Sequence, residues 1–270
     1  PITKSVNKQL LPIYDKPLIY YPLSILMLAG IKDILIIVNK GSVNQFKKIL
    51  LNGENLGVKI KYAEQDKPRG IPDAFKIGKN FIGNDSVALI LGDNFFYGQS
   101  LSDKLKKIVH LKKGASILVH PVKNPNRFGV VTLKKNKVIN LVEKPKNTKS
   151  NLAITGLYFF DNSVVKRTFN IKKSKRNELE IIDLLKNYKK TNSLKVEHLG
   201  RGAAWLDAGT IDDFNQTSIF VSSIEKRQGF KIACLEEISL KNKWIDKSKI
   251  KKAISFYGNC EYSRYLKSLL

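Results

Sequence analysis

Two aspartates follow apolar stretches and are candidate ligands of a divalent metal. Gly92-Asp93-Asn94 comes directly after the apolar run 87–91, and Asp207 follows the apolar pair Trp205-Leu206. In open α/β sheets, ligands bind outside the carboxyl ends of the strands. Mg²⁺ takes oxygen ligands, and its sites often combine one or two carboxylates with substrate phosphates. Asp93 and Asp207 are therefore suited to a metal that works on phosphate groups.

Both aspartates also have a structural interpretation. Asp and Asn favour turns and helix caps, which would suffice to explain Asp93. Asp207 could cap the helix expected near Ile211, although Thr210 or Asp212 could cap it equally well. At this level the metal-binding and the structural interpretation of each aspartate remain open.

Three basic side chains stand in motifs that could bind phosphate. Lys8 opens the segment 8–12, Lys144 follows Glu143 at the end of an expected strand, and Arg176 precedes the segment 178–180. Lysine offers a point charge to a phosphate, whereas arginine offers a planar fork. Taken alone, Lys144 is best interpreted as a solvated surface lysine, and Lys8 is unremarkable in so lysine-rich a chain.

The net charge of +25 raises the question of nucleic-acid binding. Seven of the 48 basic residues are arginine, which leaves 41 lysines (48 − 7), and these are spread along the whole chain. Because arginine is preferred for bidentate contacts to phosphates and bases, a general composition bias is the favoured interpretation. We expect no nucleic-acid partner. The alternative, a basic nucleic-acid-binding protein, predicts salt-sensitive affinity for DNA or RNA.

Alternating strand and helix patterns are expected to position these residues. Apolar runs predict strands at 34–38, 87–91 and 115–119, and the alternation of apolar residues with lysine at 58–62 predicts another strand. Helical patterns are found at 22–29, 43–51, 72–81 and 101–110. This alternation predicts a doubly wound α/β sheet.

The later part of the chain changes character. Runs at 129–133 and 138–142 flank Lys135-Asn136-Lys137, which predicts a hairpin. A strand at 153–160, a helix at 177–188 and a strand at 194–198 are expected next, and mostly helical patterns follow Thr210. We expect a main α/β domain over residues 1–220 and a helical appendage over 221–270.

Membrane and export signals are not evident. No apolar run reaches the roughly 20 residues that span a bilayer, and the start Pro1-Ile2-Thr3-Lys4 does not resemble a signal peptide. Cys234 and Cys260 lack metal-binding spacing and are interpreted as reduced thiols. These features predict a cytoplasmic protein with no membrane partner.

The motifs occur in an order that resembles one enzyme family. The matching segments are 8–12, 15–22, 91–94, 128–131, 143–145, 155–158, 178–181 and 200–210. With the ending from 225 to 266, they resemble the short bacterial form of glucose-1-phosphate thymidylyltransferase over essentially the whole chain. Each motif alone is weak evidence for the family, whereas the occurrence of all of them in this order is specific.

The resemblance implies a fold, a reaction and an assembly. The fold would be the Rossmann-like nucleotide-diphospho-sugar transferase fold, an α/β fold with a mixed central sheet and a C-terminal helical appendage. The Mg²⁺-dependent reaction would convert dTTP and glucose 1-phosphate into dTDP-glucose and pyrophosphate, for dTDP-rhamnose and related deoxysugars. Residues 1–220 would be catalytic. Residues 221–270 would serve oligomerisation or regulation, in a homotetramer with a second nucleotide-sugar site.

The same resemblance assigns roles to individual residues. Asp93 and Asp207 would hold the Mg²⁺ that bridges the nucleotide phosphates, and Lys8 would contact the triphosphate. Gln65 and Gly70 would face the thymine.

The acceptor side is assigned in the same way. Gly129, Glu143 and Thr155 would line the sugar pocket. Lys144 and Arg176 would grip the sugar phosphate, and with Lys8 they are the expected catalytic cations.

These roles agree with the chemistry of phosphate groups. The nucleophile would be a phosphate oxygen that is mostly ionised at neutral pH, because its second pKa lies near 6. No general base is then required, and the protein must instead align two anions and neutralise charge. The three histidines, His110, His120 and His198, are accordingly interpreted as structural.

The sequence also departs from the family pattern. The family begins with a strand and a glycine-rich loop ending in Gly-Thr-Arg-Leu, before a proline that corresponds to Pro1, so we expect the sequence as given to be severely impaired in turnover. Ile71-Pro72-Asp73 stands where the family usually has Leu-Ala-Gln, and Ala208 replaces a common Thr. Two alternatives remain. One is a glucose-1-phosphate transferase that uses UTP or ATP, and the other is a non-catalytic nucleotide-sugar-binding relative.

Overall fold

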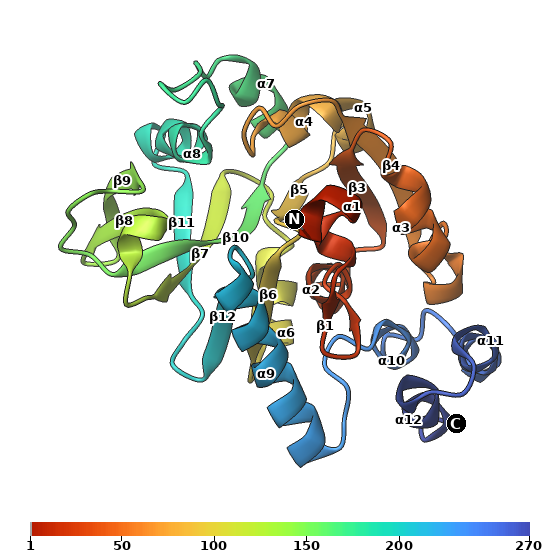
Figure 1. Ribbon diagram of the computed structural model, residues 1–270. Helices are drawn as coiled ribbons and strands as arrows, with labels where there is room; N and C mark the ends of the chain where they lie inside the picture. Colours follow the sequence, from red (N-terminus) through yellow and green to blue (C-terminus); the bar gives the residue numbers. More distant parts are fainter. Residues whose placement is uncertain (1) are drawn as a thin grey trace. The chain divides into compact units, whose positions relative to one another are not determined.

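A computed structural model describes residues 2–270, with the side chains of Ile2 and Ser5 left out, and the chain forms two compact units. The first unit comprises the described residues up to Tyr62 together with Leu91–Lys106 and Ala204–Leu270. The second unit comprises Ala63–Ile90 and Lys107–Ala203. Each unit therefore combines segments that are distant in sequence, as the colours of Figure 1 show.

The second unit is built on a mixed sheet of six strands. The order is β11-β7-β10-β8-β9, with β5 paired to β10. The strands are β5 (Val87–Ile90), β7 (Ala115–Pro121), β8 (Gly129–Lys134), β9 (Lys137–Glu143), β10 (Leu152–Phe160) and β11 (Leu194–His198). β11 runs parallel to β7, whereas the other pairs in this sheet are antiparallel. The mixed sheet confirms the expected fold class.

The hairpin of β8 and β9 has a two-residue turn. Lys134 pairs with Lys137, and the two residues between them, Lys135 and Asn136, have φ values of 48° and 60°. Positive φ at both central positions is the geometry that suits the twist of a hairpin. The predicted hairpin is confirmed, with a turn one residue shorter than expected.

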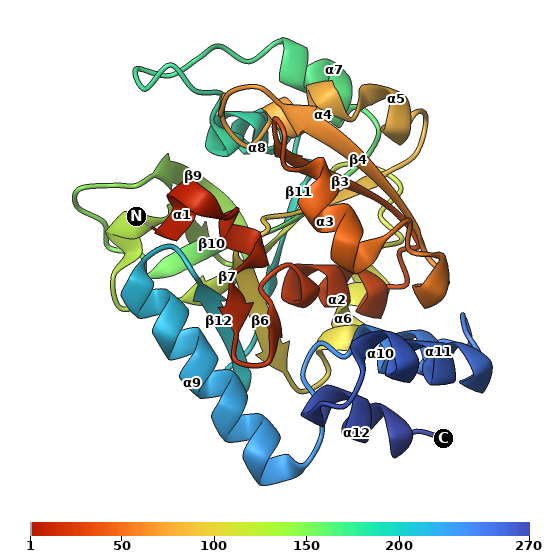
Figure 2. The same ribbon diagram turned by 45° about the vertical axis from the view of Figure 1, so that its right-hand side comes forward.

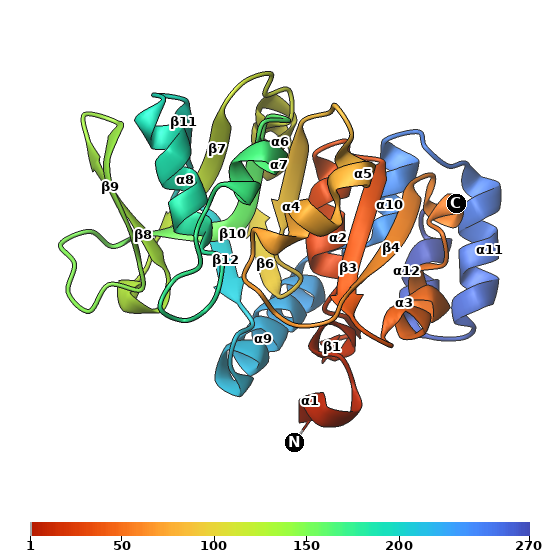
Figure 3. The same ribbon diagram turned by 90° about the horizontal axis from the view of Figure 1, so that it is seen from above.

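The core of the second unit lies between its sheet and its helices. Eight of the nine residues of β10 are buried, so this central strand carries much of the core. Helix α8 (Ile181–Lys190) faces the core with Ile181, Ile182, Leu184, Leu185 and Tyr188, a spacing typical of one helix face. Figure 3 shows α8 beside the hairpin of β8 and β9.

Two expected helices are shorter than their sequence patterns. The helix expected at 177–188 begins only at Ile181, because Asn177 has a φ of 61° and Glu180 is extended. The helix expected at 72–81 is divided at Gly78 into α4 (Asp73–Ile77) and α5 (Lys79–Ile82). Glycine is among the least helix-favouring residues, which accounts for a break at that point. Helix α7 (Val164–Phe169) completes the second unit.

The first unit combines short strand pairs with helices. Strand β3 (Asp33–Asn39) pairs with β4 (Lys59–Gln65), β6 (Asn94–Gly98) with β12 (Ala203–Asp207), and β1 (Pro12–Ile13) with β2 (Lys16–Pro17). The first helices of this unit are α1 (Ile2–Ser5), the 3₁₀ helix η1 (Lys8–Leu10), α2 (Tyr20–Leu28), α3 (Val43–Leu50), η2 (Glu54–Leu56) and α6 (Leu101–Ile108). The sequence patterns did not predict β6, which lies directly after Asp93.

The first unit ends with the helices α9 (Ile211–Gln228), α10 (Leu235–Lys241), α11 (Lys247–Tyr257) and α12 (Glu261–Lys267). Figure 2 shows α9 as one continuous helix, so the boundary expected at 220/221 falls inside it. The later helices are fastened to α2 through the buried Glu236. Its carboxylate accepts hydrogen bonds from Tyr257 at 2.8 Å and Tyr262 at 2.6 Å, and Tyr257 also bonds Tyr20 of α2.

Candidate active site

Asp93 lies where a tight packing contact brings it to Lys8. A Cβ atom at Gly92 would lie 2.9 Å from the Cγ of Gln9, so glycine allows η1 to approach this turn. The ammonium of Lys8 is then 2.9 Å from the Oδ2 of Asp93, and both side chains are about one quarter exposed. The two predicted triphosphate-site residues are therefore together in the first unit.

Two further side chains orient Asp93. The Nδ2 of Asn94 donates to the Oδ1 of Asp93 at 3.1 Å, and the indole N–H of Trp205 donates to the Oδ1 of Asn94 at 2.6 Å. Asn94 and Trp205 are both buried. The sequence patterns indicate no role for these two residues, because only the pairing of β12 with β6 brings Trp205 to Asn94.

Asp207 stands at the end of β12, beside the Asp93 turn. The backbone N–H of Ala208 donates to the carbonyl of Asp93 at 3.0 Å, so the two aspartates come from neighbouring backbone segments. Thr210 caps α9 and forms a capping box with Asp213. The capping interpretation of Asp207 is therefore wrong, because another residue performs that task.

The donor set at this place fits a hard divalent cation. Asp93 and Asp207 offer carboxylate oxygens, and no cluster of three or more His, Cys, Asp or Glu side chains suited to a metal is found among residues 2–270. Mg²⁺ commonly binds to one or two carboxylates and keeps positions for water and substrate phosphates. A site with two carboxylates agrees with this mode of Mg²⁺ binding, in which the protein supplies only some of the ligands.

The second unit holds Arg176 in a clamp of carboxylates. Its Nε donates to the Oε1 of Glu180 at 3.1 Å and its Nη2 donates to the Oε2 at 2.7 Å. Glu143 lies 3.6 Å from the same Nη2, and Ser174 donates to Glu180 at 2.6 Å. These hydrogen bonds raise the pKa of the guanidinium. Because Arg176 is 45 % exposed, this oriented cation remains accessible to solvent and to a ligand.

Glu143 and Lys144 end β9 next to this clamp. Burial raises the pKa of Glu143, as does the neighbouring Glu180, while Arg176 and Lys144 act in the opposite direction. Lys144 is exposed and has a φ of 42°, a left-handed conformation that is uncommon for lysine. Its N–H donates to the carbonyl of Phe128 at 3.0 Å, which fixes the strained backbone. Residues held this way are often found at functional sites.

Gly129 faces Glu143 across the β8–β9 ladder. A Cβ atom there would lie 2.9 Å from the Cδ1 of Ile182 and 3.3 Å from the Oε2 of Glu143, so a larger residue would displace both. Thr155 differs from the other predicted pocket residues because it is completely buried and donates to the carbonyl of Leu118 at 3.0 Å. It lies where the register of β10 shifts against β7.

Gln65 and Gly70 flank an exposed loop at the end of β4. The Nε2 of Gln65 donates to the Oδ2 of the buried Asp73 at 2.9 Å. Gly70 has a φ of 97°, and a Cβ atom there would lie 2.0 Å from the carbonyl oxygen of Leu179. The N–H of Leu179 donates to the carbonyl of Arg69 at 2.8 Å. The predicted base-binding loop is thus fastened to the segment that carries Arg176.

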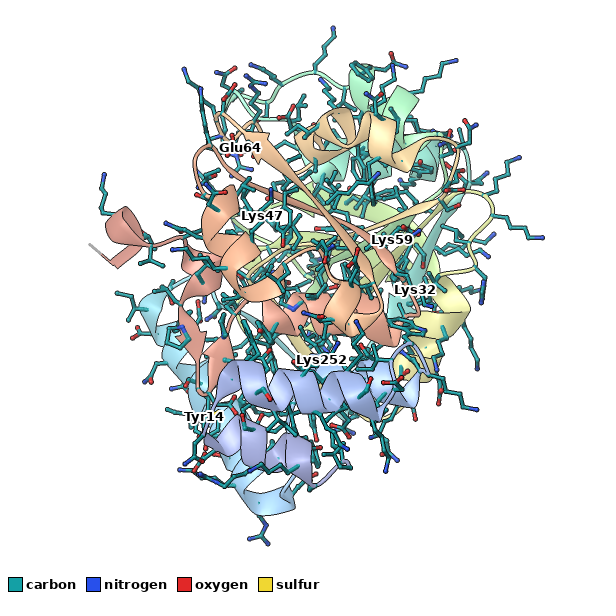
Figure 4. The ribbon with its side chains drawn as sticks, turned by 90° about the vertical axis from the view of Figure 1, so that its right-hand side faces the viewer. Tyr14, Lys32, Lys47, Lys59, Glu64 and Lys252 are labelled. Carbon is teal, nitrogen blue, oxygen red and sulfur yellow. The ribbon has the colours of Figure 1, made fainter. Side chains whose placement is uncertain are left out.

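The basic surface is not concentrated on one element. Lys47 of α3, Lys59 of β4 and Lys252 of α11 are exposed side chains from separate parts of the first unit (Figure 4). Lys32 lies 5.0 Å from the ring centre of Trp244, a cation–π contact. This distribution agrees with a general composition bias. Within residues 2–270, no helix combines the length and the apolar character that crossing a bilayer requires.

Comparison with known proteins agrees with this geometry. The family model described as Nucleotidyl transferase matches residues 1–223. A glucose-1-phosphate thymidylyltransferase of Neisseria meningitidis is 48% identical over 271 residues, covering 100% of this chain and 94% of the relative. The enzyme of the same name from Mycobacterium tuberculosis is 45% identical with the same coverage.

A solved structure supports the same conclusion. A glucose-1-phosphate thymidylyltransferase structure from Bacillus anthracis matches with a TM-score of 0.76 and 36% identity, over 82% of this chain and 88% of that chain. The match therefore extends over most of both chains. The chain therefore belongs to the nucleotidyl transferase family and, within it, to the glucose-1-phosphate thymidylyltransferases.

Proposed function

We propose that this protein transfers a thymidylyl group from dTTP to glucose 1-phosphate and releases pyrophosphate. The observation that carries the proposal is the 48% identity to a glucose-1-phosphate thymidylyltransferase over the whole of this chain. The geometry supports it, because carboxylates suited to a metal lie in one unit and an oriented arginine lies in the other.

The chemical step joins two anions. An oxygen of the glucose 1-phosphate forms a bond to the α-phosphorus of dTTP, and the bond from that phosphorus to the oxygen bridging to the β-phosphate breaks. The bonding electrons leave with pyrophosphate. Since the attacking oxygen is already ionised, no side chain must take a proton, and catalysis depends on alignment and charge neutralisation.

The cations of the second unit are suited to the acceptor phosphate. The fork of Arg176 presents donors in a plane, which matches the geometry of a phosphate, and Lys144 adds a point charge. Glu180 orients the fork before the acceptor arrives. The carboxylate of Glu143, beside Gly129, would accept hydrogen bonds from sugar hydroxyls, and Thr155 would also line the sugar pocket.

The carboxylates of the first unit are suited to the metal. Asp93 and Asp207 would hold Mg²⁺, and the bound ion would neutralise charge on the triphosphate. The ammonium of Lys8, which now pairs with Asp93, would contact the triphosphate once the metal neutralises that carboxylate. Gln65 and Gly70 would face the base.

Four wider assignments belong to the same proposal. Residues 1–220 would form the catalytic domain, and residues 221–270 would support a homotetramer and its regulation. Phe256 and Leu270, at 58% and 40% exposed, are apolar side chains of this segment that such contacts would cover. The product would supply dTDP-rhamnose or related deoxysugars, and the protein would act in the cytoplasm.

A nucleotide panel tests the proposal. The chain is incubated with Mg²⁺, glucose 1-phosphate and, in separate reactions, dTTP, UTP, ATP or CTP, and pyrophosphate release is measured. A second set uses the chain preceded by a family-type glycine-rich loop. We expect the fastest release with dTTP. Preference for ATP or UTP in both sets would contradict the proposal, as would dTDP-glucose binding without turnover.

A further inference from the structure

A buried aspartate determines which atoms Gln65 presents to its surroundings. Asp73 is only 4% exposed and stands at the first position of α4, while Gln65 is partly exposed at the end of β4. The Nε2 of Gln65 donates to the Oδ2 of Asp73 at 2.9 Å. Among the residues that the structure describes, no donor bonds the Oε1 of Gln65. The oxygen side of this amide is therefore the side left for a ligand.

The chemistry of the pair permits only this arrangement. An ionised carboxylate only accepts hydrogen bonds, whereas an amide has one donating and one accepting end. If the Gln65 amide turned over, its oxygen would oppose the carboxylate and leave a buried acceptor without a donor, which is unfavourable. Asp73 thus fixes the orientation of the Gln65 amide.

The loop around the pair holds the geometry in place. Gly70 contacts the backbone of Leu179 so closely that any Cβ atom would collide with it. The N–H of Asp73 donates to the carbonyl of Gly70 at 3.2 Å, and the N–H of Leu179 donates to Arg69. The start of α4 is therefore anchored at the loop opposite Gln65, and Asp73 cannot withdraw without breaking these contacts.

We propose that Asp73 is a specificity-determining residue that selects bases with an N3–H group. This inference rests on the proposed function, in which Gln65 faces the base. With its nitrogen held by Asp73, Gln65 presents an acceptor oxygen. Thymine and uracil carry a donor at N3, whereas cytosine carries an acceptor there, so an acceptor facing cytosine N3 leaves both groups unpaired. The fixed amide orientation favours thymine and uracil over cytosine, and it does not distinguish thymine from uracil.

The test measures dissociation constants of dTTP, UTP and dCTP by calorimetry on the full chain with Mg²⁺. The key variant is Asp73→Asn, which has nearly the same shape but can either accept from or donate to the Gln65 amide. The matched control is Asp85→Asn, which makes the same chemical change at an exposed position of the same unit, outside the loop between Gln65 and Gly70. We expect Asp73→Asn to reduce the preference for dTTP over dCTP roughly 10-fold. The ratio of dTTP to UTP affinity should not change, and the control should leave both ratios unchanged.

A reciprocal variant separates orientation from a merely structural role. Gln65→Glu alone would oppose two carboxylates and weaken binding of all three nucleotides. Combined with Asp73→Asn, the new Asn donates to the new Glu, whose second oxygen again offers an acceptor to N3–H. We expect the double variant to recover the preference for dTTP over dCTP that Asp73→Asn alone loses.

The outcomes distinguish this inference from the function on which it rests. A parent chain that binds none of the three nucleotides would contradict the proposed function and this inference with it. A parent chain that prefers dTTP to dCTP, with the same preference in Asp73→Asn, would overturn the role of Asp73 alone. Equal weakening of all nucleotides by Asp73→Asn would also overturn it, because that is the effect of a structural residue.

Discussion

Two clusters of ion pairs combine cations with carboxylates in different surroundings. In the first unit, Lys16 lies 2.5 Å from Asp15 and 3.0 Å from Glu225, and its side chain is 3% exposed. Lys231 joins this cluster through Asp15 at 2.5 Å and Glu225 at 2.8 Å. In the second unit, the cluster around Arg176 is open on one side, because the arginine is 45% exposed.

The two clusters differ in burial, and therefore in whether a ligand can reach their charges. In the buried cluster every cation has carboxylate partners and Glu225 also accepts from the N–H of Ile232, so no side is left for a ligand. In the exposed cluster, carboxylates occupy one edge of a guanidinium and leave its remainder in solvent. Charge alone does not identify a binding site. An oriented charge with an accessible face is the better candidate for one.

The largest expected effect breaks the buried cluster. Glu225→Gln leaves Lys16 and Lys231 with less compensation in a buried place, and such a loss typically costs about 3–5 kcal/mol. Urea unfolding should show this decrease in the free energy of unfolding. Glu54→Gln, at an exposed position, should change it by less than about 0.5 kcal/mol. A Glu225→Gln protein as stable as the parent would show that the cluster is not structural.

A substitution in the exposed cluster should lower catalytic activity and leave stability nearly unchanged. Arg176→Lys keeps the charge but loses the planar fork, so kcat/KM for glucose 1-phosphate should fall roughly 100-fold. The free energy of unfolding should change little, because ion pairs of exposed groups contribute little to stability. Steady-state kinetics and urea unfolding on one preparation check both statements. A large loss of stability with normal kinetics would remove the contrast between the clusters.

Lys144 allows backbone strain and charge to be measured separately. Lys144→Gly and Lys144→Ala both remove the ammonium, so both should lower kcat/KM by a similar factor. Glycine accepts the φ of 42° without strain, so the Gly variant should be more stable than the Ala variant by about 1 kcal/mol. Thermal unfolding of the two variants measures this difference. Equal stabilities would show that the left-handed backbone stores no strain.

The substitution Glu143→Gln should have the smallest effect on stability, and this effect should depend on pH. Burial and Glu180 raise its pKa in the folded state, so folding favours the protonated acid, and ionisation destabilises the protein as pH rises through the folded pKa. Glu143→Gln cannot ionise. Its stability relative to the parent should therefore increase between acidic and neutral pH, as urea unfolding at several pH values would show. A constant difference across this range would contradict the raised pKa.

The sequence was sufficient to predict long periodic elements and to single out Asp93 and Asp207, the carboxylates that we propose for the metal. Apolar periodicity placed β3, β7 and β10 close to their observed bounds, because a buried strand needs an apolar run. Asp93 was identifiable because it follows such a run. The end of the expected helix at Gly78 was not foreseen, although glycine is the residue that favours such a break.

Other features depend on contacts between distant segments. The strand β6 became recognisable only through its pairing with β12, and the orientation of Asn94 depends on Trp205, 111 residues away. The clamp on Arg176 includes Glu143 from another strand. Asp73 was noticed as a departure from the family pattern, but its bond to Gln65 required the fold. Local patterns contain no information on such pairings.

Phosphorus-31 NMR of one reaction mixture tests the central claim most directly. The chain preceded by a family-type glycine-rich loop is mixed with Mg²⁺, dTTP and glucose 1-phosphate, and all phosphorus signals are followed over time. We predict that dTDP-glucose and pyrophosphate appear in equal amounts, and that neither appears when glucose 1-phosphate is left out. Loss of dTTP that proceeds equally without glucose 1-phosphate, or yields no dTDP-glucose, would contradict the account.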